Sequence, residues 1–191
     1  MRKLKLQVQS SIDGLIAGVN GEMDWMKWNW DDELKNYVEE ITSTIDCIVL
    51  GRKLAEGFIP YWADVAANVA HPEIAAGKRF TDTKKVVFSN TLQQSAWQNT
   101  VLAKGNLAEE ITCLKQAEGG DIIAYGGATF VSGVIRENLI DEYHLIINPT
   151  AIGMGLPIFA QLKNKLNLQL ETTKSFACGI ALLKYTRKKG S

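Results

Sequence analysis

The chain has 191 residues, 46% of them hydrophobic, and its 21 basic and 21 acidic residues cancel to a formal net charge of zero. This length and apolar content suit one good-sized core, so residues 1–191 are expected to form a single domain. The balanced charge creates no field that would attract nucleic acid or an anionic membrane, and no apolar run approaches the roughly 20 residues that span a bilayer.

The N-terminal part of the chain predicts a strand, a loop and a helix. Residues 4–9 alternate apolar and polar side chains, which is typical of a strand with one buried face. Residues 10–21 are rich in Gly, Ser, Asp and Asn and predict a loop. The acidic run 31–33 predicts a helix start because carboxylates complement the positive end of the helix dipole, and apolar residues recur at helical spacing up to Ile41.

Strands alternate with helices along the rest of the chain. The expected elements are strands at 46–50, 85–88 and 100–103, a helix at 107–116, a strand at 121–125, a helix at 129–137, and strands at 143–148, 168–176 and 180–186. The segment 68–78 predicts a loop. Because crossover helices pack back onto the sheet, the pattern predicts an α/β fold with a mainly parallel sheet. The turn at Cys178-Gly179 predicts a C-terminal antiparallel hairpin.

Three of the predicted strands end in similar polar or glycine pairs. These pairs are Gly51-Arg52, Ser89-Asn90 and Gly126-Gly127. Ligands of open α/β sheets bind at the carboxyl ends of strands, where a glycine lets a phosphate approach the backbone amides and a following helix offers its positive end. Each pair alone is explained as an ordinary turn, but the three together favour an anionic, nucleotide-like ligand.

The cysteines and histidines are few. They are Cys47, Cys113, Cys178, His71 and His144. The odd number and wide spacing of the cysteines disfavour disulfides and CxxC sites, so we expect small core residues in a reducing cytoplasm. Two distant histidines cannot form a zinc site, and no metal is expected. His144 lies in an apolar strand and is expected to be a core residue. The N-terminus lacks the apolar run of a signal peptide, so a cytoplasmic protein is expected.

Several segments in chain order resemble one enzyme family. They are Ser11–Ala17, Asp24-Trp25, Ile48–Lys53, Val86–Ser89, Tyr125–Phe130, Asp141–His144 and Ile152–Phe159. Together they resemble the dihydrofolate reductase-like superfamily, and more specifically standalone relatives of the reductase domain of the bifunctional riboflavin-biosynthesis deaminase-reductase. The resemblance covers essentially the whole chain. It implies a three-layer α/β/α domain with a mixed eight-stranded sheet and an NADPH-dependent oxidoreductase. The zinc-deaminase half is absent, because no HxE…PCxxC pattern occurs.

The resemblance also assigns residues to NADPH. They are Ile16, Ala17, Gly18, Gly51, Arg52, Lys53, Ser89, Asn90, Gly126, Gly127, Ala128, Thr129 and Phe130. The first three correspond to the backbone segment that anchors the nicotinamide carboxamide. Arg52, helped by Lys53 and the Ser89-Asn90 pair, corresponds to the contact with the adenosine 2′-phosphate. The pair Gly126-Gly127 implies a strained cis peptide bond, with the following three amides against the pyrophosphate. Leu54 departs from the family's usual Thr and cannot supply its hydroxyl.

The substrate side is predicted from three tryptophans and two carboxylates. Trp25, Trp28 and Trp30 precede Asp31, and aromatic surface beside an acid suits a flat heterocycle. In dihydrofolate reductase an acid follows the matching tryptophan at about this distance, so Asp31 is a candidate catalytic acid. The alternatives are that the tryptophans are lid or core residues and that Asp31 is a helix N-cap. Asp13, in the Ser-x-Asp-Gly motif, is a second candidate or a simple turn residue.

The implied reaction is hydride transfer from NADPH to a small heterocyclic, carbonyl or imine substrate. By analogy the substrate is a pterin or a pyrimidine ribosylamino-phosphate of riboflavin biosynthesis, as in 5-amino-6-(5-phosphoribosylamino)uracil reductases. The alternative is a catalytically inactive nucleotide-binding module of the same fold, which Leu54 and the small number of candidate acids favour. Relatives commonly pair through their sheets, so a homodimer is expected.

Overall fold

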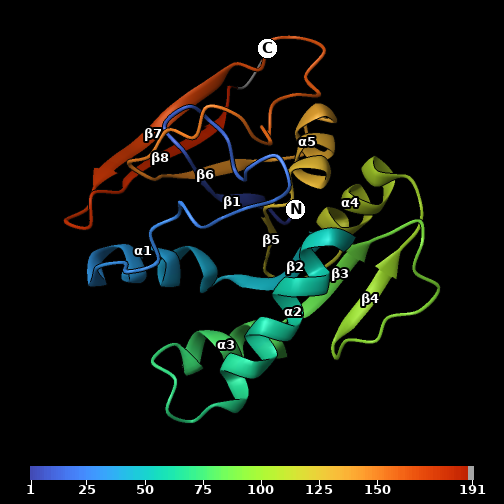
Figure 1. Cartoon of the computed structure of the whole chain (residues 1–191). Coiled ribbons are helices and arrows are strands. Elements are labelled where there is room, and N and C mark those ends of the chain that lie inside the picture. The colour runs from blue at the N-terminus through green and yellow to red at the C-terminus, as the bar shows by residue number, and fades with distance from the viewer. Residues whose placement is uncertain (189–191) are drawn as a thin grey trace.

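A computed structural model describes residues 1–188, and its elements lie close to most of those predicted (Figure 1). The strands are β1 (Leu4–Ser10), β2 (Ile45–Gly51), β3 (Lys84–Phe88), β4 (Thr100–Ala103), β5 (Asp121–Tyr125), β6 (Glu142–Ile147), β7 (Leu168–Ser175) and β8 (Ala181–Arg187). The helices are α1 (Asp32–Thr42), α2 (Arg52–Ala67), α3 (Ile74–Asp82), α4 (Leu107–Gln116) and α5 (Ala128–Arg136). No described helix is long and apolar enough to cross a membrane.

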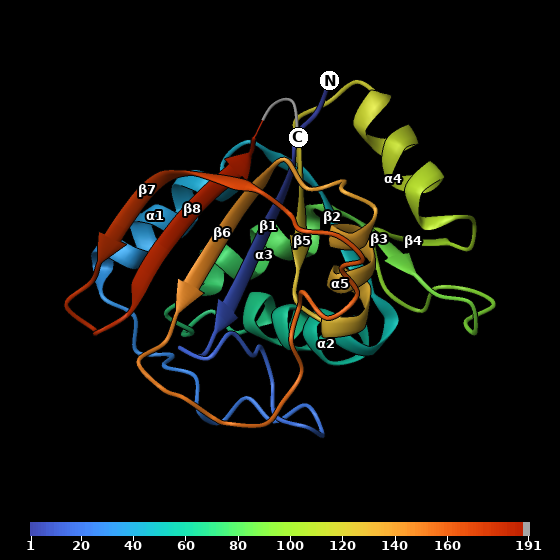
Figure 2. The same cartoon turned by 90° about the horizontal axis from the view of Figure 1, so that it is seen from above.

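The eight described strands form one mixed sheet in the order β4-β3-β2-β5-β1-β6-β8-β7, which Figure 2 shows side by side. The first six strands pair in parallel, whereas β8 pairs antiparallel with β6 and with β7. The predicted mainly parallel sheet with an antiparallel C-terminal hairpin is therefore confirmed. All the parallel strands end at one edge of the sheet, and the loops that follow them meet there.

Helices cover both faces of the sheet. On one face, α4 and α5 bury Ile111, Val131 and Val134 in a cluster with side chains of the central strands. On the other face, α1 packs near β6 and β8, and α2 and α3 pack over β2, β3 and β5. Burial of apolar side chains on both faces gives the three-layer α/β/α arrangement.

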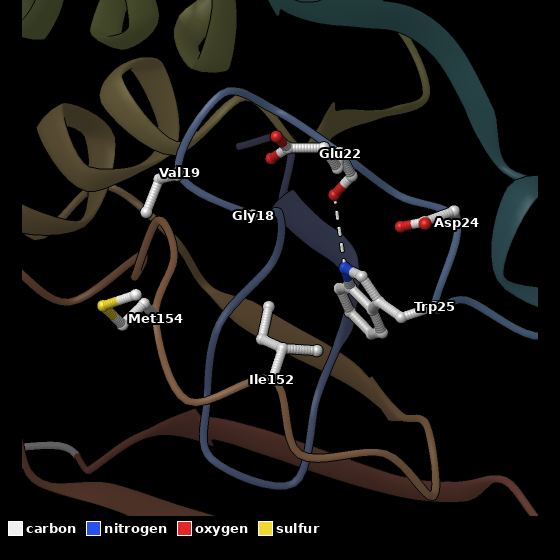
Figure 3. Close-up of a pocket in the computed structure, with 7 residues that line it drawn as sticks. All are labelled: Gly18, Val19, Glu22, Asp24, Trp25, Ile152 and Met154. Atoms are coloured by element: carbon white, nitrogen blue, oxygen red, sulfur yellow. Dashed lines mark hydrogen bonds between the residues drawn. The ribbon is translucent and has the colours of Figure 1, made fainter.

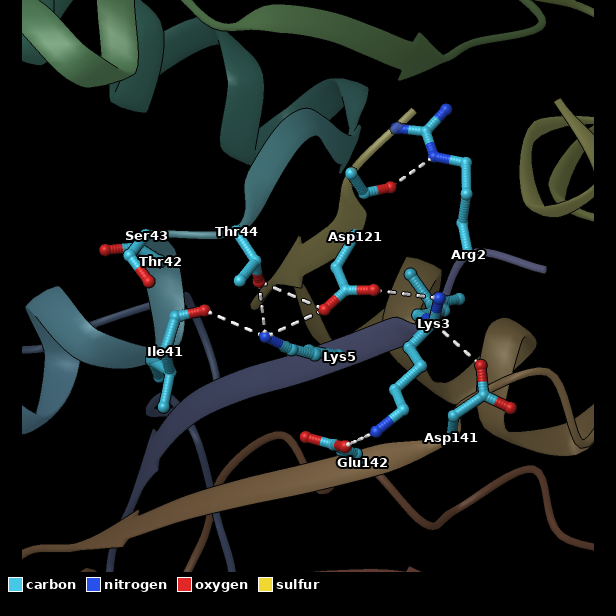
Figure 4. Close-up of polar contacts among 12 residues, drawn as sticks. Arg2, Lys3, Lys5, Ile41, Thr42, Ser43, Thr44, Asp121, Asp141 and Glu142 are labelled. Atoms are coloured by element: carbon cyan, nitrogen blue, oxygen red, sulfur yellow. Dashed lines mark hydrogen bonds and ion pairs between the residues drawn. The ribbon is translucent and has the colours of Figure 1, made fainter. Parts of the chain in front are cut away.

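The central strand β1 differs from the strand predicted at 4–9, because both of its faces are covered. Its polar residues Lys5 and Gln7 are buried. The Lys5 ammonium donates hydrogen bonds to the Ile41 carbonyl and the Thr44 hydroxyl and lies 3.1 Å from an Asp121 oxygen (Figure 4). The prediction of a solvent-facing side is wrong because the polar side chains are satisfied inside the protein rather than by water.

The amino edge of the sheet is held by ion pairs. Lys3 Nζ lies 2.7 Å from Glu142 Oε1, which joins β1 to β6 (Figure 4). Lys115 Nζ of α4 lies 2.6 Å from Asp141 Oδ2, and the same oxygen accepts a hydrogen bond from the Leu4 amide. Lys3 is exposed, but Glu142, Lys115 and Asp141 are largely shielded, so solvent screens the Lys115–Asp141 pair less than a surface pair. The charges of this edge are thus engaged in holding strands together.

Two helices lie between β2 and β3 where the sequence predicts only a loop. The loop predicted at 68–78 is wrong from Ile74 onward, where α3 begins. Pro60 lies inside α2, and Gly77 lies inside α3. A Cβ on Gly77 would come 2.8 Å from the Ala66 amide nitrogen of α2, so the glycine permits close helix contact. Proline and glycine ordinarily mark turns, so the sequence pattern does not indicate these two helices.

The three cysteines are unpaired, as the sequence predicts, but only Cys47 is a core residue. Cys113 is exposed on α4 and Cys178 is half-buried in the β7–β8 turn. The prediction that all three are core residues is therefore wrong for Cys113. Its place on the outward face of an amphipathic helix, opposite buried Ile111, explains its exposure.

His144 is a fully buried core residue of β6, as predicted. Its Nδ1 lies 2.6 Å from the Tyr37 hydroxyl, and its Nε2 lies 3.4 Å from Glu142 Oε2. The hydrogen bond from His144 is the main cause that lowers the pKa of Glu142, and burial lowers the pKa of His144 below its ordinary 6.5. The pair is thus a neutral imidazole beside a carboxylate.

This pair predicts that acid destabilises the protein. Because the folded pKa of His144 is depressed, the unfolded chain binds more protons below the ordinary value of 6.5, and stability falls as the pH falls through that range. Glu142 adds a loss below its ordinary pKa of 4.5. We expect the thermal midpoint to decrease from about pH 7 to about pH 5, and to decrease less in His144→Gln, which has no imidazole to titrate. Equal slopes in the two proteins would contradict this assignment.

Candidate functional site

The pairs that end β2, β3 and β5 meet at the carboxyl edge of the sheet. Gly51 pairs in register with Phe88, which places Ser89 beside the start of α2. The end of β5 lies between β2 and β1, so Gly126 lies between Gly51 and the loop that follows Ser10. The structure therefore brings the predicted glycine and polar pairs to one edge. The first turns of α2 and α5 begin there.

Phe130 packs closely against this edge. A Cβ on Gly51 would lie 2.6 Å from Phe130 Cβ, so no larger residue fits at Gly51 without displacing the ring. The Phe130 ring also lies 5.1 Å, between centroids, from the ring of Phe88. Packing against Phe130 therefore explains why position 51 is a glycine.

The peptide bond between Gly126 and Gly127 is trans, because residues 1–188 contain no cis peptide bond. The predicted cis bond is therefore wrong. The chain changes direction instead at Gly127, whose φ of 87° lies in the positive range that glycine adopts more readily than any other residue. Gly127 is also the N-cap of α5.

The helices α2 and α5 both begin without a side-chain cap. Gly51 and Gly127 occupy the two N-cap positions, and neither can offer an acceptor to the first amides. The helix-start amides, which include those of Ala128, Thr129 and Phe130 in α5, carry partial positive charge at the carboxyl edge. Two uncapped helix ends beside each other can bind an extended anion such as a pyrophosphate.

The segment Ile16–Gly18 lies against this edge and has an unused pair of backbone groups. The Ile16 amide donates to the Leu156 carbonyl at 3.0 Å, and the Ala17 carbonyl accepts from the Leu156 amide at 2.8 Å. Within the described chain, the Ile16 carbonyl and the Ala17 amide make no hydrogen bond. Both residues are buried. One donor and one acceptor side by side match the two polar groups of a carboxamide.

The predicted phosphate side chains are placed together but are partly engaged. Arg52 Nη1 donates to Glu56 Oε1 at 2.6 Å, one helical turn along α2. The Ser89 hydroxyl oxygen accepts from the Thr91 and Leu92 amides at 3.2 and 3.0 Å, while Lys53 and Asn90 are exposed. Glu56 is not among the site residues predicted from the sequence, although its spacing of four residues from Arg52 is the signal for a helical ion pair.

The carboxylates of the two candidate catalytic acids accept hydrogen bonds from backbone amides. Asp31 caps α1, as the alternative interpretation predicts: one carboxylate oxygen accepts from the Leu34 amide at 2.9 Å and the other from the Cys178 amide at 3.0 Å. These bonds lower the pKa of Asp31. Asp13 accepts from the Gly153 amide at 2.7 Å, and its pKa is lowered, with the hydrogen bond from Ser11 as the main cause. Their catalytic roles stay predictions.

The three tryptophans do not share one pocket. Trp25 lines an open pocket of about 380 Å³, shown in Figure 3, together with Gly18, Val19, Glu22, Asp24, Ile152 and Met154. Trp28 is 63% exposed. Trp30 packs against the hydrophobic cluster of α1, and its indole N–H donates to the Lys27 carbonyl at 2.8 Å. Trp25 therefore shares a pocket with Gly18, the last residue of the Ile16–Gly18 segment.

A family model described as the RibD C-terminal domain matches residues 2–182. The chain belongs to the RibD C-terminal domain family. The uncharacterised protein YyaP of Bacillus subtilis (strain 168) is 32% identical over 186 residues, which cover 96% of this chain and 94% of YyaP. The resemblance to standalone relatives of the reductase domain is therefore confirmed.

Solved structures confirm the fold of this RibD C-terminal domain protein. A Shewanella sp. PV-4 protein whose name refers to riboflavin biosynthesis superposes with a TM-score of 0.72 at 22% identity, over 99% of this chain and 100% of that one. The Thermotoga maritima diaminohydroxyphosphoribosylaminopyrimidine deaminase/5-amino-6-(5-phosphoribosylamino)uracil reductase superposes with a TM-score of 0.69 at 15% identity. That match covers 98% of this chain and 57% of the longer enzyme.

Proposed function

We propose that this RibD C-terminal domain protein is an NADPH-dependent reductase that acts on a small heterocyclic, carbonyl or imine substrate. Membership of a reductase-domain family supports an oxidoreductase of the riboflavin-precursor or pterin type. The three unpaired cysteines suit the reducing cytoplasm, where we place the reaction.

The observation that carries the proposal is the unused donor and acceptor at Ile16–Ala17, beside two uncapped helix ends. In this arrangement the Ala17 amide and the Ile16 carbonyl bind the nicotinamide carboxamide. The α5 start, from Gly126 to Phe130, binds the pyrophosphate, and Arg52 with Lys53, Ser89 and Asn90 binds the 2′-phosphate. The bound cofactor supplies the hydride, and the chain supplies position and charge.

The experiment that tests this proposal has two steps. The first titrates the protein with NADPH by fluorescence, and the second follows loss of NADPH absorbance with a panel of pterins, pyrimidine riboflavin precursors and simple carbonyl compounds. Binding followed by substrate-dependent oxidation would support a reductase. Binding without any turnover would support the inactive nucleotide-binding module, which Leu54 and the engaged carboxylates of Asp13 and Asp31 favour. Absence of NADPH binding would contradict both.

We further propose that two copies of the chain pair through the β6–β8–β7 part of the sheet. On its side away from α1 no described helix covers this region (Figure 1). The strand register places a row of apolar side chains on that side, and they are partly exposed. These side chains, here called the hairpin face, are Leu145, Ile147, Leu170, Leu183 and Tyr185. A contiguous apolar patch of this kind marks an interaction surface.

Leu170→Glu is expected to convert the dimer to a monomer, because it places a charge inside the proposed interface. Leu170 is 50% exposed on edge strand β7, so the folded monomer should tolerate the change. Val101→Glu is a matched control, since Val101 is also 50% exposed but lies on β4 at the opposite edge. Light scattering should show a monomer for Leu170→Glu alone. A wild-type monomer, or a dimeric Leu170→Glu, would contradict the interface.

A further inference from the structure

Residues 18–22 form a tight hairpin at the end of the proposed nicotinamide segment. The Gly18 amide donates to the Glu22 carbonyl at 2.9 Å, and the Gly21 amide donates to the Gly18 carbonyl at 3.1 Å. Gly21 has a φ of 95°, and a short hairpin loop of this kind needs a positive φ at that position. The fold of the hairpin therefore requires glycine at position 21.

Asn20 closes this hairpin through the side chain of Glu22. The Asn20 backbone amide donates to Glu22 Oε2 at 2.9 Å, and Asn20 Nδ2 donates to Glu22 Oε1 at 2.7 Å. The hydrogen bond from the Asn20 side chain is the main cause that lowers the pKa of Glu22. An ionised carboxylate only accepts hydrogen bonds, so this side-chain contact depends on Nδ2 as a donor.

The Glu22 carboxylate also packs against Gly18. A Cβ on Gly18 would clash with Glu22 Oε2, so the carboxylate lies where a side chain of residue 18 would be. Gly18 ends the Ile16–Gly18 segment and lines the Trp25 pocket (Figure 3). The Trp25 indole N–H donates to the Glu22 carbonyl at 3.2 Å. A change in the contact between Asn20 and Glu22 therefore affects both Gly18 and Trp25.

The dipeptide Asn20-Gly21 is the only Asn-Gly pair in the sequence. In such a pair the glycine nitrogen can attack the side-chain carbonyl carbon of the asparagine, because glycine has no side chain to obstruct the approach. The new N–C bond replaces the bond to Nδ2, which leaves as ammonia with the proton that the glycine nitrogen loses. Addition of water to either carbonyl of the resulting succinimide ring gives aspartate or iso-aspartate.

The hairpin gives this reaction room and water. Asn20 and Gly21 are both exposed, and no described atom beyond the chain neighbours lies within 4 Å of the Cβ position of Gly21. The attack requires the hydrogen bond from the Gly21 amide to open, and local opening costs little in an exposed loop. The same glycine that the hairpin needs thus makes the preceding asparagine reactive.

We infer that Asn20 is a modification site, where spontaneous deamidation loosens the hairpin that holds Gly18. Deamidation replaces the Nδ2 donor by a carboxylate, which then faces the carboxylate of Glu22. The hydrogen bond at Glu22 Oε1 is lost and two like charges repel each other. Iso-aspartate also adds one carbon to the main chain inside the loop. The resulting loss of NADPH binding rests on the proposed function, whereas the modification itself does not.

The first test follows the mass of the peptide that contains Asn20. The folded full chain is incubated in mildly alkaline buffer and digested at intervals. We expect this peptide to gain one dalton and to separate into aspartate and iso-aspartate forms. Asn36 and Asn106 are also exposed but precede bulky residues, so they should stay unchanged. Asn20→Gln, whose amide must close a larger ring, should also stay unmodified. No gain at Asn20, or an equal gain at the other two asparagines, would overturn the inference.

The second test uses Asn20→Asp, which has the charge of the modified protein without incubation. Hydrogen exchange of the Gly18 amide should be severalfold faster than in the wild type, because its bond to the Glu22 carbonyl is weakened. Asn36→Asp adds the same charge to the exposed face of α1 and should exchange like the wild type. Unchanged exchange in Asn20→Asp would overturn the effect on the hairpin.

NADPH titration of the same proteins separates this inference from the proposed function. Asn20→Asp should bind NADPH severalfold more weakly than the wild type, and Asn36→Asp should bind it equally well. Wild-type affinity in Asn20→Asp would overturn the link between the hairpin and the cofactor. Failure of every protein to bind NADPH would contradict the reductase alone, because the mass and exchange measurements still decide whether Asn20 is modified.

Discussion

Arg52→Ala is expected to weaken NADPH binding by roughly 10- to 100-fold and to leave NADH binding nearly unchanged. One or two charge-assisted hydrogen bonds to the 2′-phosphate are worth about 1.5–3 kcal/mol, which corresponds to that loss. NADH has a hydroxyl where NADPH has the phosphate, so the guanidinium contributes little to its binding. Fluorescence titration with both nucleotides measures the two constants. An equal loss for both would mean that Arg52 acts on the fold or on a shared part of the cofactor.

Glu56 provides a matched test in the opposite direction. Its carboxylate holds Arg52 at 2.6 Å and would have to release it for the 2′-phosphate. Glu56→Gln should therefore strengthen NADPH binding severalfold, because it removes both a competitor and a negative charge near the phosphate. Both side chains are partly exposed, so the ion pair contributes little to stability and the thermal midpoint should change little. Weaker NADPH binding in Glu56→Gln would contradict a phosphate at Arg52.

The elements predicted most accurately are those whose boundaries are marked by a capping residue or by polar turn residues. The helix expected at 107–116 agrees with α4, where the Asn106 side chain caps the Ala108 and Glu109 amides. Strands β4 and β5 also agree with their predicted bounds, since each is an apolar run between polar turns. The helices α2 and α3 were hidden by Pro60 and Gly77, which ordinarily mark turns. The close contact between helices that Gly77 permits is not revealed by a single sequence.

The sequence predicted those parts of the candidate site that depend on residue type and on the order of the strands. The order of strands places Gly51, Ser89 and Gly126 at one edge, and the sequence marks these positions. The unused backbone groups of Ile16 and Ala17 were not predictable, because they depend on pairing with Leu156, far away in the sequence. For the same reason the sequence could not show that the second carboxylate oxygen of Asp31 is engaged, since it accepts a hydrogen bond from the distant amide of Cys178.

Gly126→Ala is expected to abolish most NADPH binding while leaving the fold intact. A Cβ on Gly126 would meet no protein atom closer than Ile16 Cδ1, at 3.9 Å, which is an ordinary van der Waals contact. Its φ also lies outside the positive range that glycine alone adopts freely, so alanine should leave stability unchanged or raise it by about 0.4–1 kcal/mol. A glycine that the protein does not require is explained if a ligand passes where its side chain would be, and the pyrophosphate is the group proposed there.

Gly51→Ala is the counterpart that should damage the fold. Its Cβ would lie 2.6 Å from Phe130 Cβ, and overpacking of this kind costs about 1–3 kcal/mol. Thermal unfolding and NADPH titration of the two variants thus distinguish a glycine required by packing from one required by a ligand. Gly126→Ala should unfold near the wild-type temperature and bind NADPH at least about ten-fold more weakly, while Gly51→Ala should unfold at a lower temperature. If Gly126→Ala binds NADPH with wild-type affinity, the pyrophosphate binds elsewhere. If Gly126→Ala is destabilised, the glycine is required by the fold rather than by a ligand.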